Sequence, residues 1–179
     1  ATFGYALSAN TNGVRPADLR RVVPHDSAWT ELVFVDGRFR GDLSRGAQNG
    51  LTTTSLADVP DAEAAVIENH IARYAASEED GFTALNTAFL TDGAFVHVPD
   101  DVEASSTVHL VFLSTGPAES TVSHPRTLIV TGRNSRLTVV ESYVGLADSP
   151  YFTNSVVEIA SGEGSRIDHY RILLETAKA

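Results

Sequence analysis

The chain contains no cysteine and no methionine among its 179 residues. Without cysteine, the chain itself cannot form disulfides, supply thiolate metal ligands or a cysteine nucleophile, or carry a persulfide. Methionine is missing even at position 1. Its absence there suggests processing, an engineered start or a modified methionine, and we expect the sequence to be a fragment of a longer protein.

Basic residues and long apolar runs are also scarce. Thirteen Lys and Arg residues stand against 23 Asp and Glu residues, which gives a net charge of −10. Binding to nucleic acid or to an anionic membrane needs clustered basic residues, so both are excluded. The longest aliphatic and aromatic runs, such as residues 110–113, are far shorter than the roughly 20 residues of a membrane span. With no signal peptide in view, we expect a soluble protein that is cytoplasmic by default.

The most informative feature that is present is an internal repeat. The segment Gly-Arg-Asn-Ser-Arg-Leu at residues 132–137 reappears as Gly-Glu-Gly-Ser-Arg-Ile at residues 162–167, thirty residues later (162 − 132 = 30). A β-rich run precedes each copy of the glycine, and another follows each Ser-Arg-apolar step. A fixed period of this length is typical of stacked architectures, in which each unit buries its apolar face against its neighbours.

Short helices and one hairpin are expected upstream of residue 90. Pro16 suits the first position of a helix because its missing N–H is not needed there. The Asp36-Gly37 pair predicts a turn between two short strands, and Asp61 is available to cap the longest helix. The predicted helices cover residues 16–21, 62–76 and 83–90. Residues 1–15 have the composition of a poorly ordered lead-in.

Downstream of Gly93 the pattern is almost wholly β. The predicted strands cover residues 94–98, 108–114, 127–131, 137–143, 156–160 and 167–174. They carry many β-branched residues and little strict alternation, which is typical of strands covered on both faces. With the thirty-residue period, this predicts a mainly β fold: a parallel β-helix, preceded by a small α/β region. We expect residues 1–81 to form the N-terminal mixed domain and residues 82–179 the first coils of the core.

The repeat also predicts how neighbouring strands stack. The expected pairs are Leu137 with Ile167, Val139 with His169, Glu141 with Arg171, and Tyr143 with Leu173. Adjacent strands lie about 4.8 Å apart, so Glu141 and Arg171 could form a cross-strand pair worth roughly 0.2–1 kcal/mol. If the stack is truncated, the last strand has a free edge, and we expect self-association through it.

Two arrangements of histidine could carry chemistry. His97 and His109 could meet on neighbouring coils and, with Asp92 or Asp100, bind a divalent ion. Spacing alone does not bring such a set together, and strand histidines bonded to backbone or water are the simpler interpretation. No metal ligand is therefore assigned.

A catalytic triad could be sought in Asp168 and His169 with Ser142 or Ser165. Adjacent residues on a strand point to opposite faces, so Asp168 could not easily orient His169. No catalytic residue is therefore assigned.

Residues 84–99, Ala-Leu-Asn-Thr-Ala-Phe-Leu-Thr-Asp-Gly-Ala-Phe-Val-His-Val-Pro, closely resemble the start of the core domain in the SufB/SufD family of iron–sulfur cluster assembly proteins. Further similar segments lie at residues 33–39, 126–130, 139–143, 151–154 and 166–170. The resemblance covers about residues 82–175 well, with the segments in the family's order. The cysteine-free core and the helical N-terminal region favour the SufD branch.

The resemblance implies a right-handed parallel β-helix and a non-catalytic scaffold role. The implied partners are SufB and the ATPase SufC, in a complex that builds a nascent Fe–S cluster and passes it to apo-proteins. The family's proposed cluster residues and its SufC-binding helices lie further along the polypeptide than this chain extends. No catalytic, cofactor-binding or metal-binding residue is therefore transferred to it.

A competing interpretation is a β-helix module that binds or degrades polysaccharide. Such enzymes need two acid/base groups facing one groove, usually with aromatic platforms. The aromatic residues after residue 93 form no stripe in the sequence: Phe95, Phe112, Tyr143, Tyr151, Phe152 and Tyr170. A clustered aromatic groove in the structure would favour glycan binding, and its absence the scaffold.

Overall fold

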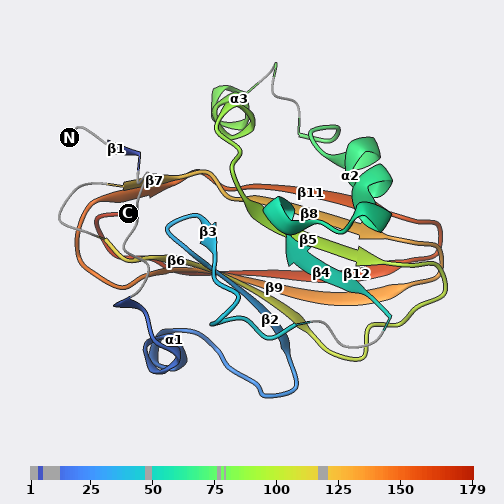
Figure 1. The fold of residues 1–179 in the computed structure, drawn as a ribbon, viewed down its shortest axis with the longest axis horizontal. Helices are drawn as coiled ribbons and strands as arrows, with labels where there is room; N and C mark the ends of the chain where they lie inside the picture. Colours follow the sequence, from blue (N-terminus) through green and yellow to red (C-terminus); the bar gives the residue numbers. More distant parts are fainter. Residues whose placement is uncertain (1–3, 6–12, 47–49, 76–77, 79, 117–120) are drawn as a thin grey trace.

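The computed structural model describes residues 4–5, 13–46, 50–75, 78, 80–116 and 121–179 (Figure 1). Strands dominate these residues, so the predicted mainly β class is confirmed. None of the helices in the described ranges is both long and apolar enough to cross a membrane.

The elements follow one another in a simple order. The helices are α1 (Pro16–Val22), α2 (Ala64–His70) and α3 (Gly81–Ala88), with the 3-10 turns η2 (Leu56–Asp58) and η3 (Asp61–Glu63) before α2. The strands are β1 (Gly4–Tyr5), β2 (Thr30–Val35), β3 (Arg38–Phe39), β4 (Thr52–Ser55), β5 (Gly93–Val98), β6 (Val108–Ser114), β7 (Thr121–Ser123), β8 (Arg126–Thr131), β9 (Arg136–Gly145), β10 (Tyr151–Thr153), β11 (Val156–Ser161) and β12 (Arg166–Leu174).

The strands form three parallel-rich sheets. One sheet has the order β11-β8-β5-β4, a second has the order β12-β9-β6-β2-β3, and a small third sheet has the order β1-β7-β10. Among the described strands most pairs are parallel, and only β3 on β2 and β4 on β5 are antiparallel. Figure 1 shows the two larger sheets as two layers. At the right-hand end of the view, the chain passes from one layer to the other.

The predicted register between β9 and β12 is confirmed. Leu137 lies beside Ile167 and Glu141 beside Arg171, and the other two expected pairs are also found. The same offset of thirty residues joins β8 to β11, where Arg126 lies beside Val156 (156 − 126 = 30). The repeat in the sequence therefore corresponds to neighbouring parallel strands in both larger sheets.

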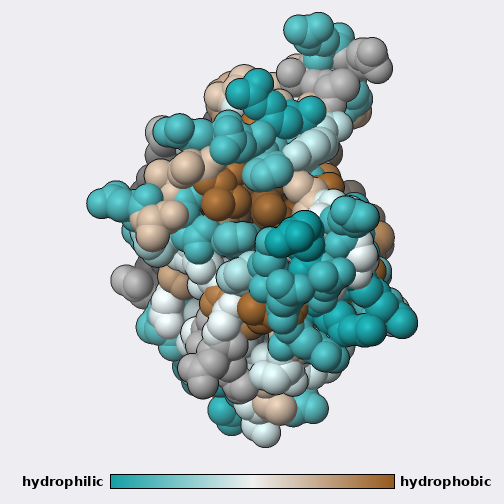
Figure 2. Space-filling view, turned by 90° about the vertical axis from the view of Figure 1, so that its right-hand side faces the viewer, coloured by the Kyte–Doolittle hydropathy of each residue, from teal (hydrophilic) through white to brown (hydrophobic). Residues whose placement is uncertain are grey.

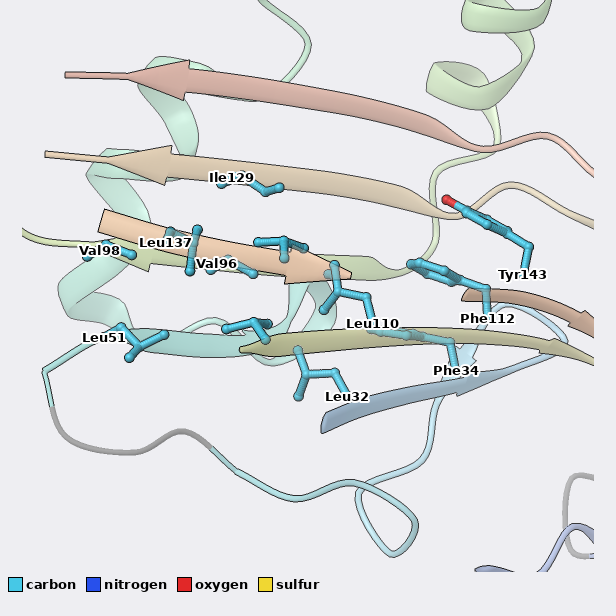
Figure 3. Close-up of a cluster of buried hydrophobic side chains, with 13 residues drawn as sticks. Leu32, Phe34, Leu51, Val96, Val98, Leu110, Phe112, Ile129, Leu137 and Tyr143 are labelled. Atoms are coloured by element: carbon cyan, nitrogen blue, oxygen red, sulfur yellow. The ribbon is translucent and has the colours of Figure 1, made fainter. Parts of the chain in front are cut away.

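The main core lies between the two larger sheets (Figure 3). Leu32, Leu110 and Leu137 from one sheet meet Val96 and Ile129 from the other. Along one side of this core Phe34, Phe112 and Tyr143 stack across three neighbouring strands, with ring centroids 5.1 and 4.9 Å apart.

The helices cover the outer faces of the sheets. Leu19 of α1 packs against Val33 and Leu113, and Val66 of α2 packs in the cluster around Phe95. Because both faces of the central strands are covered, these strands show the little strict alternation noted above.

The helix expected over residues 62–76 is shorter than predicted. Asp61 begins a 3-10 turn instead of capping a helix, and α2 ends at His70. The reason lies far away in the sequence. The Glu158 carboxylate accepts hydrogen bonds from the backbone N–H groups of Ala72, Tyr74 and Ala75, which holds this segment in a turn.

Other boundaries also differ from the prediction. Helix α3 begins at Gly81, two residues early, because the Asp80 carboxylate accepts a hydrogen bond from the Thr83 N–H. The short strands β4, β7 and β10 were not predicted, since three or four residues give little periodic signal. The expected lead-in lies largely outside the described residues, and within it Gly4–Tyr5 forms β1 beside β7.

Candidate functional site

Three of the buried polar clusters in the described residues are places where chemistry could be sought. The first lies on the outer face of the β8–β11 pair. Arg126 donates from Nε and Nη2 to Glu158 Oε2 at 2.9 and 2.7 Å, and neither side chain is exposed. Arg126 Nη1 also donates to Asn86 Oδ1 of α3 at 3.0 Å. This cluster fixes α3 and the segment after α2 onto the sheet.

Hydrogen bonds set the ionisation of Glu158. Burial alone would raise the pKa of this carboxyl group. The backbone donors of Tyr74, Ala75 and Ala72, together with Arg126, outweigh burial and hold the pKa of Glu158 below its ordinary value. The carboxylate therefore remains charged and matched to its guanidinium partner.

The second cluster joins three strands of the five-stranded sheet. His109 Nε2 lies 2.8 Å from Ser142 Oγ, and His109 Nδ1 lies 3.2 Å from Glu31 Oε2. Burial would raise the pKa of Glu31, but the hydrogen bond and charge of His109, with Arg45 and His25 nearby, lower it. Glu31 also lines a cavity of about 170 Å³ beneath α1.

The order serine, histidine, carboxylate is that of a catalytic triad, but access decides against such a role here. Ser142 and His109 are both 0% exposed, so a substrate carbonyl cannot reach the serine oxygen. Trp29 closes one side by packing edge-on against the His109 ring at 5.3 Å. The geometry supports a structural tie between β2, β6 and β9.

The third cluster lies between β9 and β12. Tyr143 Oη donates to Glu141 Oε2 at 3.3 Å, and Arg171 Nε lies 3.6 Å from the same oxygen, which confirms the predicted Glu141–Arg171 pair. The Arg171 guanidinium also lies 4.7 Å from the centre of the Tyr143 ring. Burial and the neighbouring Glu141 charge raise the pKa of Tyr143, so its hydroxyl stays protonated as a donor.

The structure separates the histidines considered for metal binding. His97 Nδ1 lies 2.8 Å from Glu63, whereas His109 contacts Glu31 and Ser142. Asp92 accepts hydrogen bonds from Ser55 and from the backbone of Phe39 and Gly93, while Asp100 is paired with Arg133. Among the described residues, no three metal-binding side chains come together in a geometry that could hold an ion.

The structure also separates the residues considered for a catalytic triad, Asp168 and His169 with Ser142 or Ser165. Asp168 pairs with Arg166, whereas His169 lies near Glu141 at 3.5 Å. Ser165 donates to the backbone oxygen of Gly162. Asp168 therefore does not orient His169.

Sequence reasoning missed the residues that form the most buried ties: Glu31, Asn86, Arg126 and Glu158. A signal was present for two of them, because Arg126 and Glu158 are charged residues within β-rich runs. Charged residues are rarely fully buried unless paired, so each predicts a partner without identifying it. The partners are 32 residues apart and can be recognised only from the register.

Comparison with known protein families identifies the family of the chain. Residues 2–110 match the family described as SufBD protein N-terminal region, and residues 112–179 match the SUF system FeS cluster assembly, SufBD core domain. The chain belongs to the SufBD family. The two SufBD matches follow each other directly along the chain and together span nearly all of it.

Two curated relatives place this SufBD chain in context. It is 33% identical over 155 residues to the iron–sulfur cluster assembly SufBD family protein slr0076 of Synechocystis. The matched region covers 79% of the chain and 33% of this relative. It is 24% identical over 155 residues to protein ABCI7, chloroplastic, of Arabidopsis thaliana. This match covers 80% of the chain and 32% of this relative. The matched region is thus about a third of each relative's length.

Proposed function

We propose that this chain is the N-terminal part of a SufD-type, non-catalytic scaffold subunit of the Suf iron–sulfur cluster assembly complex. The observation that carries the proposal is the consecutive match of residues 2–110 and 112–179 to the two SufBD family models. The absence of cysteine supports the SufD branch, as does the helical content before residue 90. The three buried polar clusters support a non-catalytic role, because each of them ties structural elements together.

We infer further that the parallel strands continue as a right-handed parallel β-helix. The in-register pairs β8–β11 and β9–β12, both offset by thirty residues, support this arrangement. The division between residues 1–81 and 82–179 and the cytoplasmic location remain predictions for the whole protein.

The proposed partners are SufB and SufC. In this proposal the Fe–S cluster belongs to the full complex, and its ligands lie outside this chain. Self-association through the free edge of β12 also remains a prediction. Leu173 on that strand is 63% exposed, which supports it. Light scattering of the 179-residue chain, at several concentrations, tests whether a dimer forms.

Copurification tests the proposed function. The full-length gene is expressed with its chromosomal neighbours and an affinity tag on its own product. The expected result is copurification of an ATPase and a paralogous SufBD subunit in fixed ratio. A second preparation with the tag on an unrelated protein controls for adhesion to the resin. Recovery of the tagged chain alone, from cells that contain both neighbours, would contradict the proposal.

The polysaccharide alternative lacks the groove that it requires. Of the six aromatic residues after residue 93, four are buried: Phe95, Phe112, Tyr143 and Tyr151. Phe152 is half-buried, and Tyr170 is the exposed member of this set. The set therefore forms no continuous stacking platform for sugar rings in the described part of the chain.

A further inference from the structure

The repeated segment Gly-x-x-Ser-Arg-apolar contains one position that the fold does not explain. Its glycines lie where successive turns stack, because a Cβ added at Gly162 would come within 2.5 Å of the Gly132 carbonyl carbon. Its serines close these turns, since Ser135 and Ser165 each donate to the glycine carbonyl oxygen three residues earlier at 2.7 Å. The apolar position also has a structural role, because Leu137 lies in the core. The glycine, the serine and the apolar residue are thus explained by the fold, and the arginine is the fixed position that remains.

The repeated arginines have no such role. Arg136 is exposed, and its side chain makes no hydrogen bond or ion pair with any residue that the structure describes. Arg166 contacts Asp168 through two long hydrogen bonds of 3.3 and 3.4 Å, and the side chains are 66% and 41% exposed. Neither arginine therefore contributes much to stability, because exposed ion pairs are worth little.

The register nevertheless places these two arginines side by side. Arg136 pairs directly with Arg166 in the parallel β9–β12 ladder. Neighbouring strands are about 4.8 Å apart, and like charges at such positions repel each other. The pair lines a cavity of about 160 Å³, together with Thr138, Glu103 and Asp168. Figure 2 views this end of the molecule, whose surface is mostly hydrophilic around small hydrophobic areas.

We propose that Arg136 and Arg166 form a binding site for a small oxyanion, either a phosphate ion or the carboxylate of a partner's side chain. An oxyanion would neutralise the repulsion between the two guanidinium groups and could accept bidentate hydrogen bonds from each. Thr138 supplies a hydroxyl group in the same cavity. The site is distinct from the three buried clusters and does not depend on the proposed Suf function.

Two carboxylates limit the strength of this site. Glu103 and Asp168 line the same cavity, and Asp168 must share or release Arg166 when an anion binds. The whole chain has a net charge of −10, which also disfavours anions. We therefore expect dissociation constants of about 1 mM, a binding free energy of about −4 kcal/mol.

NMR titration of the 179-residue chain tests the proposal. The Nε–Hε resonances of the arginines are followed while inorganic phosphate replaces chloride at constant ionic strength. The expected result is a saturable shift at Arg136 and Arg166, and at least tenfold weaker binding in Arg136→Gln. The matched control is Arg133→Gln, in the turn directly before β9. The Arg133 side chain is also exposed, and it is paired with Asp100. This variant should bind phosphate as the unmodified chain does.

A second titration, with acetyl-aspartate amide, whose one carboxylate is that of the side chain, separates the two sources of an oxyanion. Tighter binding of phosphate identifies a free inorganic ion, and tighter binding of acetyl-aspartate amide identifies a carboxylate side chain. Either result supports the site. The proposal is overturned if the shifts do not saturate with either compound, or if all arginines respond alike. Unchanged binding by Arg136→Gln, with an unchanged amide spectrum, also overturns it.

Discussion

Arg126 and Glu158 form an ion pair whose two side chains have no exposed surface, with Nη2 and Oε2 2.7 Å apart. The Glu158 carboxylate also accepts hydrogen bonds from three backbone N–H groups of the segment after α2. The Arg126 guanidinium also donates a hydrogen bond to Asn86 of α3. One charged pair therefore holds together two strands, the turn after α2, and α3.

Breaking this pair should cost much of the stability of the protein. Glu158→Gln leaves the buried Arg126 charge without its counter-charge, and we expect the free energy of unfolding to fall by roughly 3–5 kcal/mol. Urea unfolding followed by circular dichroism measures the change. Asp100→Asn removes the exposed pair with Arg133 and should cost less than about 1 kcal/mol. Equal losses in the two variants would contradict the proposed role of burial.

The stability should also depend on pH through Glu158. Its pKa is lower in the folded protein than in the unfolded chain, so its contribution is complete above the ordinary pKa near 4.5 and is lost as the pH falls through the folded pKa. Urea unfolding at a series of pH values from 7 to 3 should show this loss. The difference between the unmodified chain and Glu158→Gln should shrink with falling pH. A constant difference over that range would mean that the carboxylate is not the titrating group.

The stacked turns predict a sharp difference between glycines. A Cβ at Gly162 would meet backbone atoms of the preceding turn at 2.5 Å, so Gly162→Ala must push the two turns apart. We expect a loss of roughly 1–3 kcal/mol in the free energy of unfolding, which is usual for overpacking. Gly46 has no atom within 4 Å of an added Cβ, and Gly46→Ala serves as the control. Chemical denaturation of both variants decides whether the turns are in contact.

Ser142 should matter for stability and not for catalysis. Ser142→Ala removes the hydroxyl partner of a fully buried His109 nitrogen, with an expected cost of about 1–3 kcal/mol. Ser27→Ala, at an exposed position, should change stability by less than about 0.5 kcal/mol. A fluorophosphonate probe should not label Ser142 in the folded protein. Labelling of that serine under native conditions would show that it is accessible after all.

The repeat allowed the register of β9 and β12 to be predicted before the structure was known. Identical turn chemistry at Gly132 and Gly162 starts both strands at the same point, and the period then determines which residues are neighbours. The mainly β class could be predicted for a similar reason, because β-branched residues dominate after Gly93. Both inferences rest on local sequence patterns.

The first two buried polar clusters, around Glu158 and around His109, could not be predicted in this way. Glu31, His109 and Ser142 come from three strands. Glu31 and His109 are 78 residues apart in the sequence, and their side chains meet because the parallel ladder of β2 and β6 pairs these two residues. The end of α2 was missed for the same reason, since the carboxylate that binds the following backbone is 86 residues away from Ala72. Local propensity carries no information about partners at such distances.

The connections between the two large sheets are unequal in length. Nine residues join β5 to β6 (107 − 98 = 9), whereas four join β8 to β9 (135 − 131 = 4) and four join β11 to β12 (165 − 161 = 4). Amino acids can therefore be added or deleted in the longer crossing from β5 to β6 only where Val102 and Ala104 keep their packing against the main core. Loss of a single amino acid within β9, by contrast, would turn Glu141 and Tyr143 to the opposite face of the sheet.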